Sequence, residues 1–124
     1  MSFESDLRAC LLPLVTSGVY FGVLPLDKVP TAESPSRAGW SAIVLPTEIV
    51  TPDNTICGAS DLEDYRVQID AYAPSYGQLV TLRTQIFSAV EATFESAARI
   101  NDLTDYDPDL KLHRRIIEYS ISAE

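Results

Sequence analysis

The stretch from residue 62 to residue 94 constrains the fold of this chain most, because its hydrophobic period changes at Pro74. From Leu62 to Ala73 apolar and polar residues alternate, and this period of two predicts a strand with one buried and one wetter face. After Pro74, Ser75 is a good helix cap, and apolar residues recur at helical spacing at positions 79, 82, 86, 87, 90 and 94. A strand followed directly by an amphipathic helix indicates an α+β domain.

The same reasoning predicts one further helix and three further strands. Apolar residues at positions 3, 7, 11 and 14 share one helical face, and we expect Pro13 to kink or end that helix. β-Branched and aromatic residues predict strands at 19–24, 40–50 and 110–122. Because the second of these strands contains Pro46, we expect it to lie at an edge of the sheet or to contain a bulge.

The segments between these elements are expected to be loops. Residues 27–39 and the acidic residues 99–109 lack a clear period, and Pro52 to Asn54 with Gly58 predict a turn region. The predicted fold class is α+β, a four-stranded, mostly antiparallel sheet with two helices packed on one face, in the order α-β-β-β-α-β. We expect one domain over residues 1–124, since a chain of this length can bury a core of its own.

Charge and cysteine content narrow the functional classes. The net charge of −9, from 18 acidic and 9 basic residues, argues against phosphate-backbone binding, which needs clustered Lys and Arg. Residues 9–26 look apolar, but Glu4 and Asp6 precede them and Pro and Gly interrupt them, so neither a signal peptide nor a membrane span is expected. We therefore expect a cytoplasmic site of synthesis, with Cys10 and Cys57 as free thiols.

No residue pattern predicts catalysis, a cofactor or a metal. His113 is the only histidine, and no Ser-His-Asp, Cys-His or zinc arrangement can be built around it. The aspartates at 105, 107 and 109 resemble the start of a calcium loop, but Leu110 and Ile116 stand where that loop needs Gly and Glu. A solvated acidic loop is the simpler interpretation, and a weak cation site is the alternative.

The densest basic run is formed by Lys111, Arg114 and Arg115, beside His113. Since the chain has many more acidic than basic residues, we predict that these side chains pair with carboxylates of a neighbouring subunit. Ordinary solvation and nucleic-acid binding are the alternatives.

Three segments together resemble the tail-terminator (tail completion) proteins of long-tailed bacteriophages. They are SFESDLRACLLPLV with GVYFGVLP, the central TPDNTICGASDLEDYRVQIDAYAPSYGQ, and the closing LHRRIIEYSIS. The segment 27–39 is longer and more polar than the family's usual approach to the second strand. The resemblance therefore leaves the role of this loop open.

The resemblance implies a structural protein without enzymatic activity or cofactor. It implies a homo-oligomeric ring, usually a hexamer, at the head-proximal end of the tail tube in the virion, made in the host bacterial cytoplasm. Its partners would be the tail tube protein and the head completion or connector protein, with DNA passing through the lumen without specific binding and no membrane involved. The alternative is a small-ligand or peptide-binding module, with Arg66, Gln68 and Tyr72 on the wetter sheet face.

Edge strands and the loops beside them are the natural ring or tube contacts, because their unpaired backbone groups can extend a sheet into a neighbour. The strand that contains Pro46 and the loop after it are our first choice, and the 27–40 loop is the second. The predicted ring or tube interface residues are Thr47, Glu48, Ile49, Asp53, Asn54, Thr55, Ile56, Leu62, Arg37 and Trp40.

Overall fold

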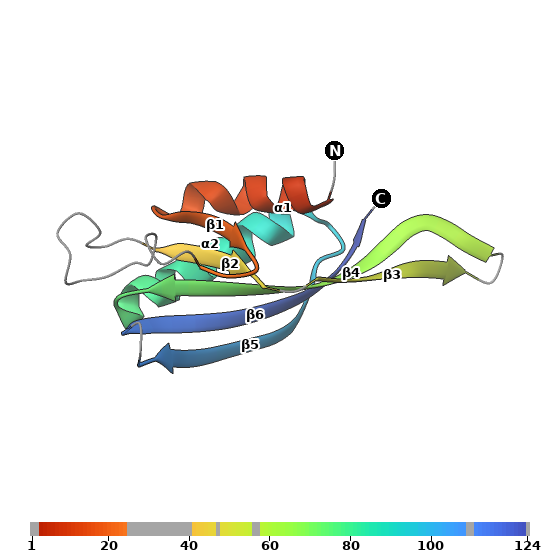
Figure 1. Ribbon diagram of the computed structural model, residues 1–124. Helices are drawn as coiled ribbons and strands as arrows, with labels where there is room; N and C mark the ends of the chain where they lie inside the picture. Colours follow the sequence, from red (N-terminus) through yellow and green to blue (C-terminus); the bar gives the residue numbers. More distant parts are fainter. Residues whose placement is uncertain (1–2, 25–40, 47, 56–57, 109–110, 124) are drawn as a thin grey trace.

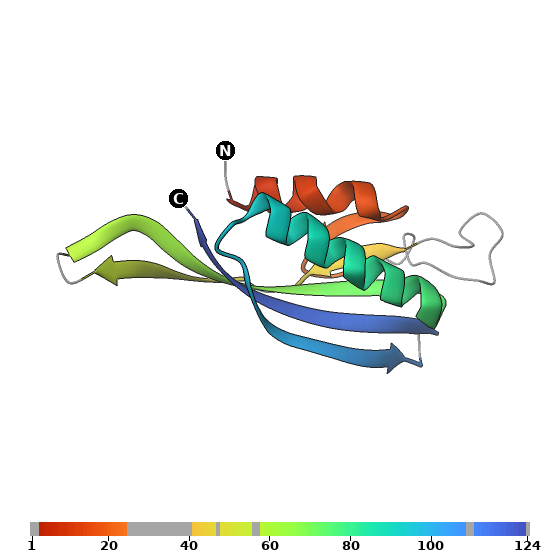
Figure 2. The ribbon, with the colours of Figure 1, turned by 180° about the vertical axis from the view of Figure 1, so that it is seen from behind.

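The computed structural model describes residues 3–24, 41–46, 48–55, 58–108 and 111–123, and of residues 48–55, 58–64 and 123 it describes the backbone alone. Over these residues the chain forms two α-helices, a short 3-10 helix and one sheet of six strands. Both α-helices lie on the same face of the sheet (Figures 1 and 2). No helix in the described ranges is both long and apolar enough to cross a membrane.

The first helix, α1 (Phe3–Leu11), buries one side and ends where the sequence predicts. Phe3, Leu7 and Leu11 are buried, and Glu4 and Asp6 lie in the first turn, where the helix dipole favours anions. The chain then tightens into the 3-10 helix η1 (Leu12–Leu14), which contains Pro13, because proline cannot continue the α-helical hydrogen bonds.

The second helix, α2 (Tyr76–Thr93), begins at the predicted cap. The Ser75 hydroxyl accepts a hydrogen bond from the Gln78 backbone N–H at 3.2 Å, which satisfies one of the unpaired donors of the first turn. The predicted apolar stripe is confirmed, since the side chains at 79, 82, 86, 87 and 90 are buried and Phe94 packs against them at the end of the helix.

The sheet is mixed, with one parallel pair. Its strands are β1 (Gly18–Phe21), β2 (Ala42–Leu45), β3 (Glu48–Thr55), β4 (Gly58–Ala73), β5 (Ala98–Asp107) and β6 (Leu112–Ala123). Five of them follow the order β1-β2-β4-β6-β5, and β3 pairs with the first half of β4. The β1–β2 pair is parallel and all other pairs are antiparallel.

The predicted alternation of buried and exposed residues along β4 is confirmed, and its buried face forms the centre of the hydrophobic core. Residues 65, 67, 69, 71 and 73 of β4 are buried under the helices, opposite the buried Ile117, Tyr119 and Ile121 of β6. Phe3 of α1 stacks on Tyr65 with ring centroids 4.0 Å apart, so the first helix is tied directly to the central strand.

Three details of the predicted fold are wrong. The sheet has six strands in the described ranges, not four. The strand predicted at 40–50 is two strands that meet around Pro46, and the predicted turn region after it is mostly β3. The expected acidic loop at 99–109 contains β5, whose apolar residues do not alternate, since Leu103 and Tyr106 lie opposite Ile116 and His113 and therefore on different faces of the sheet.

Candidate assembly interface

The predicted interface residues that the structure describes come together on one hairpin. Glu48, Ile49, Asp53, Asn54 and Thr55 lie on β3, and Leu62 lies on the facing part of β4. Arg37, Trp40, Thr47 and Ile56 lie outside the described residues. Sequence analysis treated 47–62 as a strand end and loop, and the structure makes it a hairpin instead.

This hairpin, the β3–β4 arm (residues 48–55 and 58–62), begins inside the sheet, where residues 48–51 pair with residues 64–67 of β4, and its outer part extends away from the helices and the rest of the sheet (Figure 1). The last rung between β4 and β6 joins Glu63 and Ala123. Residues 58–62 therefore pair with β3 alone among the described strands, with rungs at Asn54–Ala59 and Thr55–Gly58. A two-stranded ribbon is marginally stable in water, so its open edges suit pairing with another protein.

Two features of β3 fit an edge position. Pro52 has no N–H to donate, and proline in a sheet is confined to edges and bulges. The register shifts between Pro52 and Asn54, which leaves Asp53 without an opposite residue. Such a bulge strengthens the local twist and bends the ribbon.

The basic residues predicted to pair between subunits lie at the other end of β6. Lys111 precedes the strand with φ 55, in the left-handed region. The Arg114 guanidinium binds Asp70 of β4 at 2.5 Å and lies 3.7 Å from Asp105 of β5. Its Nε atom is buried, and no described residue provides a hydrogen-bond acceptor for it.

Arg115 also binds a carboxylate of its own chain. Its Nε donates to Asp102 Oδ1 at 2.5 Å, and Arg83 of α2 binds Asp102 Oδ2 at 2.6 Å. These hydrogen bonds, that of Arg115 foremost, lower the pKa of Asp102 to about 2. Asp102 is therefore a structural ion-pair partner that joins β5, β6 and α2, and not part of a solvated loop.

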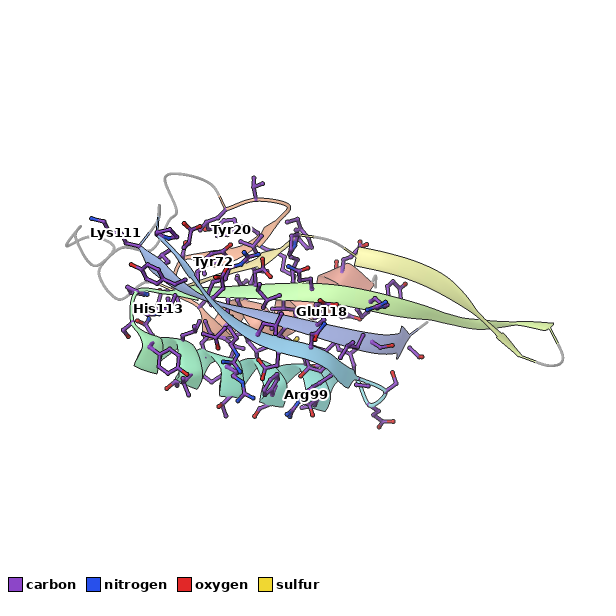
Figure 3. The ribbon with its side chains drawn as sticks, turned by 90° about the horizontal axis from the view of Figure 1, so that it is seen from below. Tyr20, Tyr72, Arg99, Lys111, His113 and Glu118 are labelled. Atoms are coloured by element: carbon purple, nitrogen blue, oxygen red, sulfur yellow. The ribbon has the colours of Figure 1, made fainter. Side chains whose placement is uncertain are left out.

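A second polar cluster joins α2 to the other end of β5. Glu91 accepts hydrogen bonds from Arg99 Nε at 2.8 Å and from the Tyr119 hydroxyl at 2.7 Å. The Arg99 guanidinium lies 3.8 Å from the centre of the Phe87 ring. Figure 3 shows Arg99 beside α2 and His113 near the N-terminal end of that helix. Burial of the Tyr119 ring and the adjacent Glu91 carboxylate raise the pKa of the Tyr119 hydroxyl.

The sheet face without helices carries the side chains expected for the alternative ligand-binding module. Each of them contacts another side chain on this face. Gln68 donates to Asp70 at 2.8 Å, Arg66 lies 3.7 Å from Glu118, and Arg114 lies over the Tyr72 ring. No specific contact on this face therefore favours a ligand site.

Within the described residues, no three His, Cys, Asp or Glu side chains are grouped so as to hold a metal ion. His113 lies between the rings of Tyr106 and Tyr76, at centroid distances of 5.0 and 6.0 Å. Cys10 is a free thiol that donates to the Leu7 carbonyl at 3.2 Å, and burial raises its pKa. Cys57 lies outside the described residues.

Sequence reasoning missed β5 as a surface. This strand is ten residues long and pairs with β6 alone among the described strands, so its outer edge is open. Ile100, Leu103 and Tyr106 are exposed on it. Their spacing of three does not fit the period of a strand, and the Asn and three Asp of this segment are residue types depleted in strands, so no local signal predicted β5.

Comparison with known proteins gives a family and a fold. A family model described as "Tail completion protein gp17" matches residues 6–124. A chain from the "Virion of native gene transfer agent (GTA) particle" has a similar structure, with a TM-score of 0.53 and 17% sequence identity over 96% of this chain and 89% of that chain. At this identity the structural match shows the fold alone. No curated protein matches the sequence.

Proposed function

Because the chain belongs to the bacteriophage tail completion protein family, a family of structural tail proteins and not of enzymes, we propose that it caps the head-proximal end of the tail tube as a ring. The ring, a hexamer by resemblance, stops tube polymerisation and forms the joint to the head completion complex. The observation that carries the proposal is the family match over residues 6–124, because it includes the helices, the sheet and the β3–β4 arm together.

The β3–β4 arm is the part of the chain that we assign to the tail tube. Its outer rungs have no other described strand beside them, so both edges offer backbone donors and acceptors to a partner. Residues 48–64 contain five acidic residues and no Lys or Arg, so a tube surface with basic groups would suit the arm.

The predicted pairing of Lys111, Arg114 and Arg115 with a neighbouring subunit stays a prediction. Arg114 and Arg115 already bind carboxylates of their own chain. If they also contact a neighbour, they do so as members of these clusters.

A nonsense mutation in this gene, within the phage or prophage that carries it, tests the proposal. Electron microscopy of the induced lysate should show abnormally long tails without heads, because tube growth is no longer stopped. Supplying the intact chain from a plasmid should restore normal tails. Tails of normal length joined to heads in the mutant lysate would contradict the proposal.

A further inference from the structure

β5 is attached to the rest of the chain without contributing to its hydrophobic core. Asp102 and Asp107 are half-buried, and the other residues of the strand are exposed. None of its side chains belongs to the cluster of buried apolar residues that the helices and the strands β1, β2, β4 and β6 form. Among the described strands, only β6 pairs with β5. If β5 leaves β6, every member of the buried cluster therefore remains in place on other elements.

Charged side chains occupy the side of β5 that faces the helices. Arg99 and Asp102 lie opposite residues of β6 that are buried under the helices, and opposite residues of paired strands share a face. Asp102 binds Arg83 of α2 at 2.6 Å, and Arg99 Nε donates to Glu91 of α2 at 2.8 Å. Two ion pairs thus join β5 to α2, whereas β4 and β6 present apolar side chains to the helices.

Water reaches both of these ion pairs. The exposed fraction of the side chain is 23% for Asp102, 30% for Arg83 and 49% for Arg99. Dissolved salt screens ion pairs that are partly exposed, whereas it does not weaken the burial of apolar side chains. The attachment of β5 to α2 should therefore depend on ionic strength, unlike that of β4 and β6.

A side chain of α2 keeps Phe87 partly covered when β5 leaves. The Phe87 ring is buried, and the guanidinium groups of Arg99 and Arg83 lie 3.8 and 4.5 Å from its centre. Arg83 belongs to α2 itself, so it stays near the ring when Arg99 departs with β5. Opening of β5 therefore breaks mainly backbone hydrogen bonds and ion pairs, whose polar groups water can bind instead.

Both ends of β5 are anchored, so the strand is not a free chain end. Before it, the Ser96 hydroxyl donates to the Ser122 carbonyl at 2.7 Å and accepts from the Ser122 N–H at 2.9 Å. After it, Leu112, the first residue of β6, is fully buried. Opening therefore displaces β5 between two fixed points and leaves the elements on either side in place.

We propose that β5 is a strap, held to α2 by ion pairs, that opens as one unit and uncovers the outer edge of β6 while the helices and the other strands stay folded. Elements held by few buried apolar contacts open locally at a lower free energy than the core. The open form exposes the backbone groups of β6 that β5 otherwise pairs, so the closed strap covers an edge to which another strand could bind. Opening is a property of the single chain and does not depend on the proposed ring.

Hydrogen exchange of the purified full chain, measured by NMR at pH 7, tests this opening. The slowly exchanging amides of β5 should share one protection factor, at least about tenfold lower than that of residues 65–73 in β4, because they exchange without global unfolding. Raising sodium chloride from about 0.05 M to about 1 M should lower the β5 protection factor by roughly threefold or more. Equal protection of β5 and β4, or no response of β5 to salt, would overturn the proposal.

Two variants separate opening of the strap from unfolding of the domain. Arg83→Gln removes the α2 partner of Asp102 and should lower the protection of β5 by roughly fivefold. Residues 65–73 should lose the same factor, because the ion pair is absent in the open and in the unfolded chain alike. Ile43→Val, in the buried part of β2, should lower the protection of residues 65–73 by roughly fivefold and leave β5 unchanged, because β2 stays folded when the strap opens.

The matched control for the charge change is Arg66→Gln. The Arg66 guanidinium lies 3.7 Å from Glu118 and joins β4 to β6, so its loss should change the protection of β5 by less than about twofold. A loss of β5 protection in Ile43→Val equal to that of residues 65–73 would show that β5 opens only with the whole domain. Unchanged β5 protection in Arg83→Gln would show that the ion pair does not hold the strap. Either result would overturn the proposal.

Discussion

At the scale of single residues, the most consequential side chain in the described structure is Asp102. It lies on a strand that looks like a loop in the sequence, and it binds Arg115 of β6 and Arg83 of α2. A carboxylate that accepts hydrogen bonds from two guanidinium groups holds three elements in register. The exposed edge of β5 thus depends on an ion pair on the helix side of the sheet.

Replacing Asp102 with Asn should lower the free energy of unfolding at pH 7 by about 2 kcal/mol, since the pKa is lowered from about 4 to about 2. A lowered carboxyl pKa stabilises the fold above pH 4, and that stability is lost as the pH falls toward 2. The parent should therefore lose stability between pH 4 and pH 2 more steeply than Asp102→Asn. Urea unfolding at several pH values measures both.

The matched control is Asp105→Asn on the same strand. Asp105 is more exposed and lies 3.7 Å from its partner, so its loss should change the free energy of unfolding by less than about 1 kcal/mol. Equal effects of the two substitutions would contradict the special role of Asp102.

At the scale of elements, α2 is the helix whose sequence and structure agree best. Its cap and its buried stripe follow from local chemistry. Ser75 holds its first turn through one hydrogen bond to the backbone of Gln78.

Ser75→Ala should lower the free energy of unfolding by about 1 kcal/mol, because the hydrogen bond from the Gln78 backbone N–H to the Ser75 hydroxyl is lost. Ser88→Ala, at an exposed position in the same helix, is the control and should be neutral or slightly stabilising, since alanine is the better helix former. Thermal unfolding of the two variants side by side measures the difference. A loss of stability in Ser88→Ala as large as that in Ser75→Ala would argue against a capping effect.

In the β3–β4 arm, by contrast, sequence and structure agree less well, since a predicted loop is a hairpin whose outer part lies away from the helices. Replacing residues 54–59 with Asn-Gly, which favours a tight hairpin turn, removes the last rungs and keeps Asp53 and Ser60 in the chain. The melting temperature should change by no more than about 4 °C, equivalent to roughly 1 kcal/mol. Phage that carry this variant should produce overlong tails, because the tube contact is lost. Tails of normal length would contradict the proposed contact between the arm and the tail tube.

At the scale of the whole molecule, the excess of acidic over basic residues determines how strongly the protein binds DNA. Each chain carries a net charge of −9, so a six-membered ring carries six times that value, or −54. Several of the described arginines are paired within the chain, at Asp70, Asp102 and Glu91. Few cations are then left to hold a phosphate backbone.

The purified protein should leave duplex DNA unshifted in a gel-mobility assay at about 0.15 M salt, because binding to the phosphate backbone needs clustered cations. A retarded band that weakens as salt is added would show that a basic surface dominates despite the net charge. It would contradict passage of DNA without binding.

Local chemistry alone determined much of this protein. The alternation of residues 65–73, the Ser75 cap, the stripe of α2 and the helix end before Pro13 are visible in the sequence, because each depends on neighbours a few residues away. The family signature is visible for the same reason, as an ordered series of such elements.

Tertiary structure alone decided that residues 98–107 form a strand and that residues 48–62 form an arm. β5 has no buried apolar face, so only its backbone pairing with β6 and the ion pairs of Asp102 and Arg99 make it a strand. The outer part of the arm depends on a rung pattern between β3 and β4 alone among the described strands, at Asn54–Ala59 and Thr55–Gly58. Contacts between distant parts of the chain leave no local period, which is why the strand β5 and the hairpin form of residues 48–62 became visible only in the folded molecule.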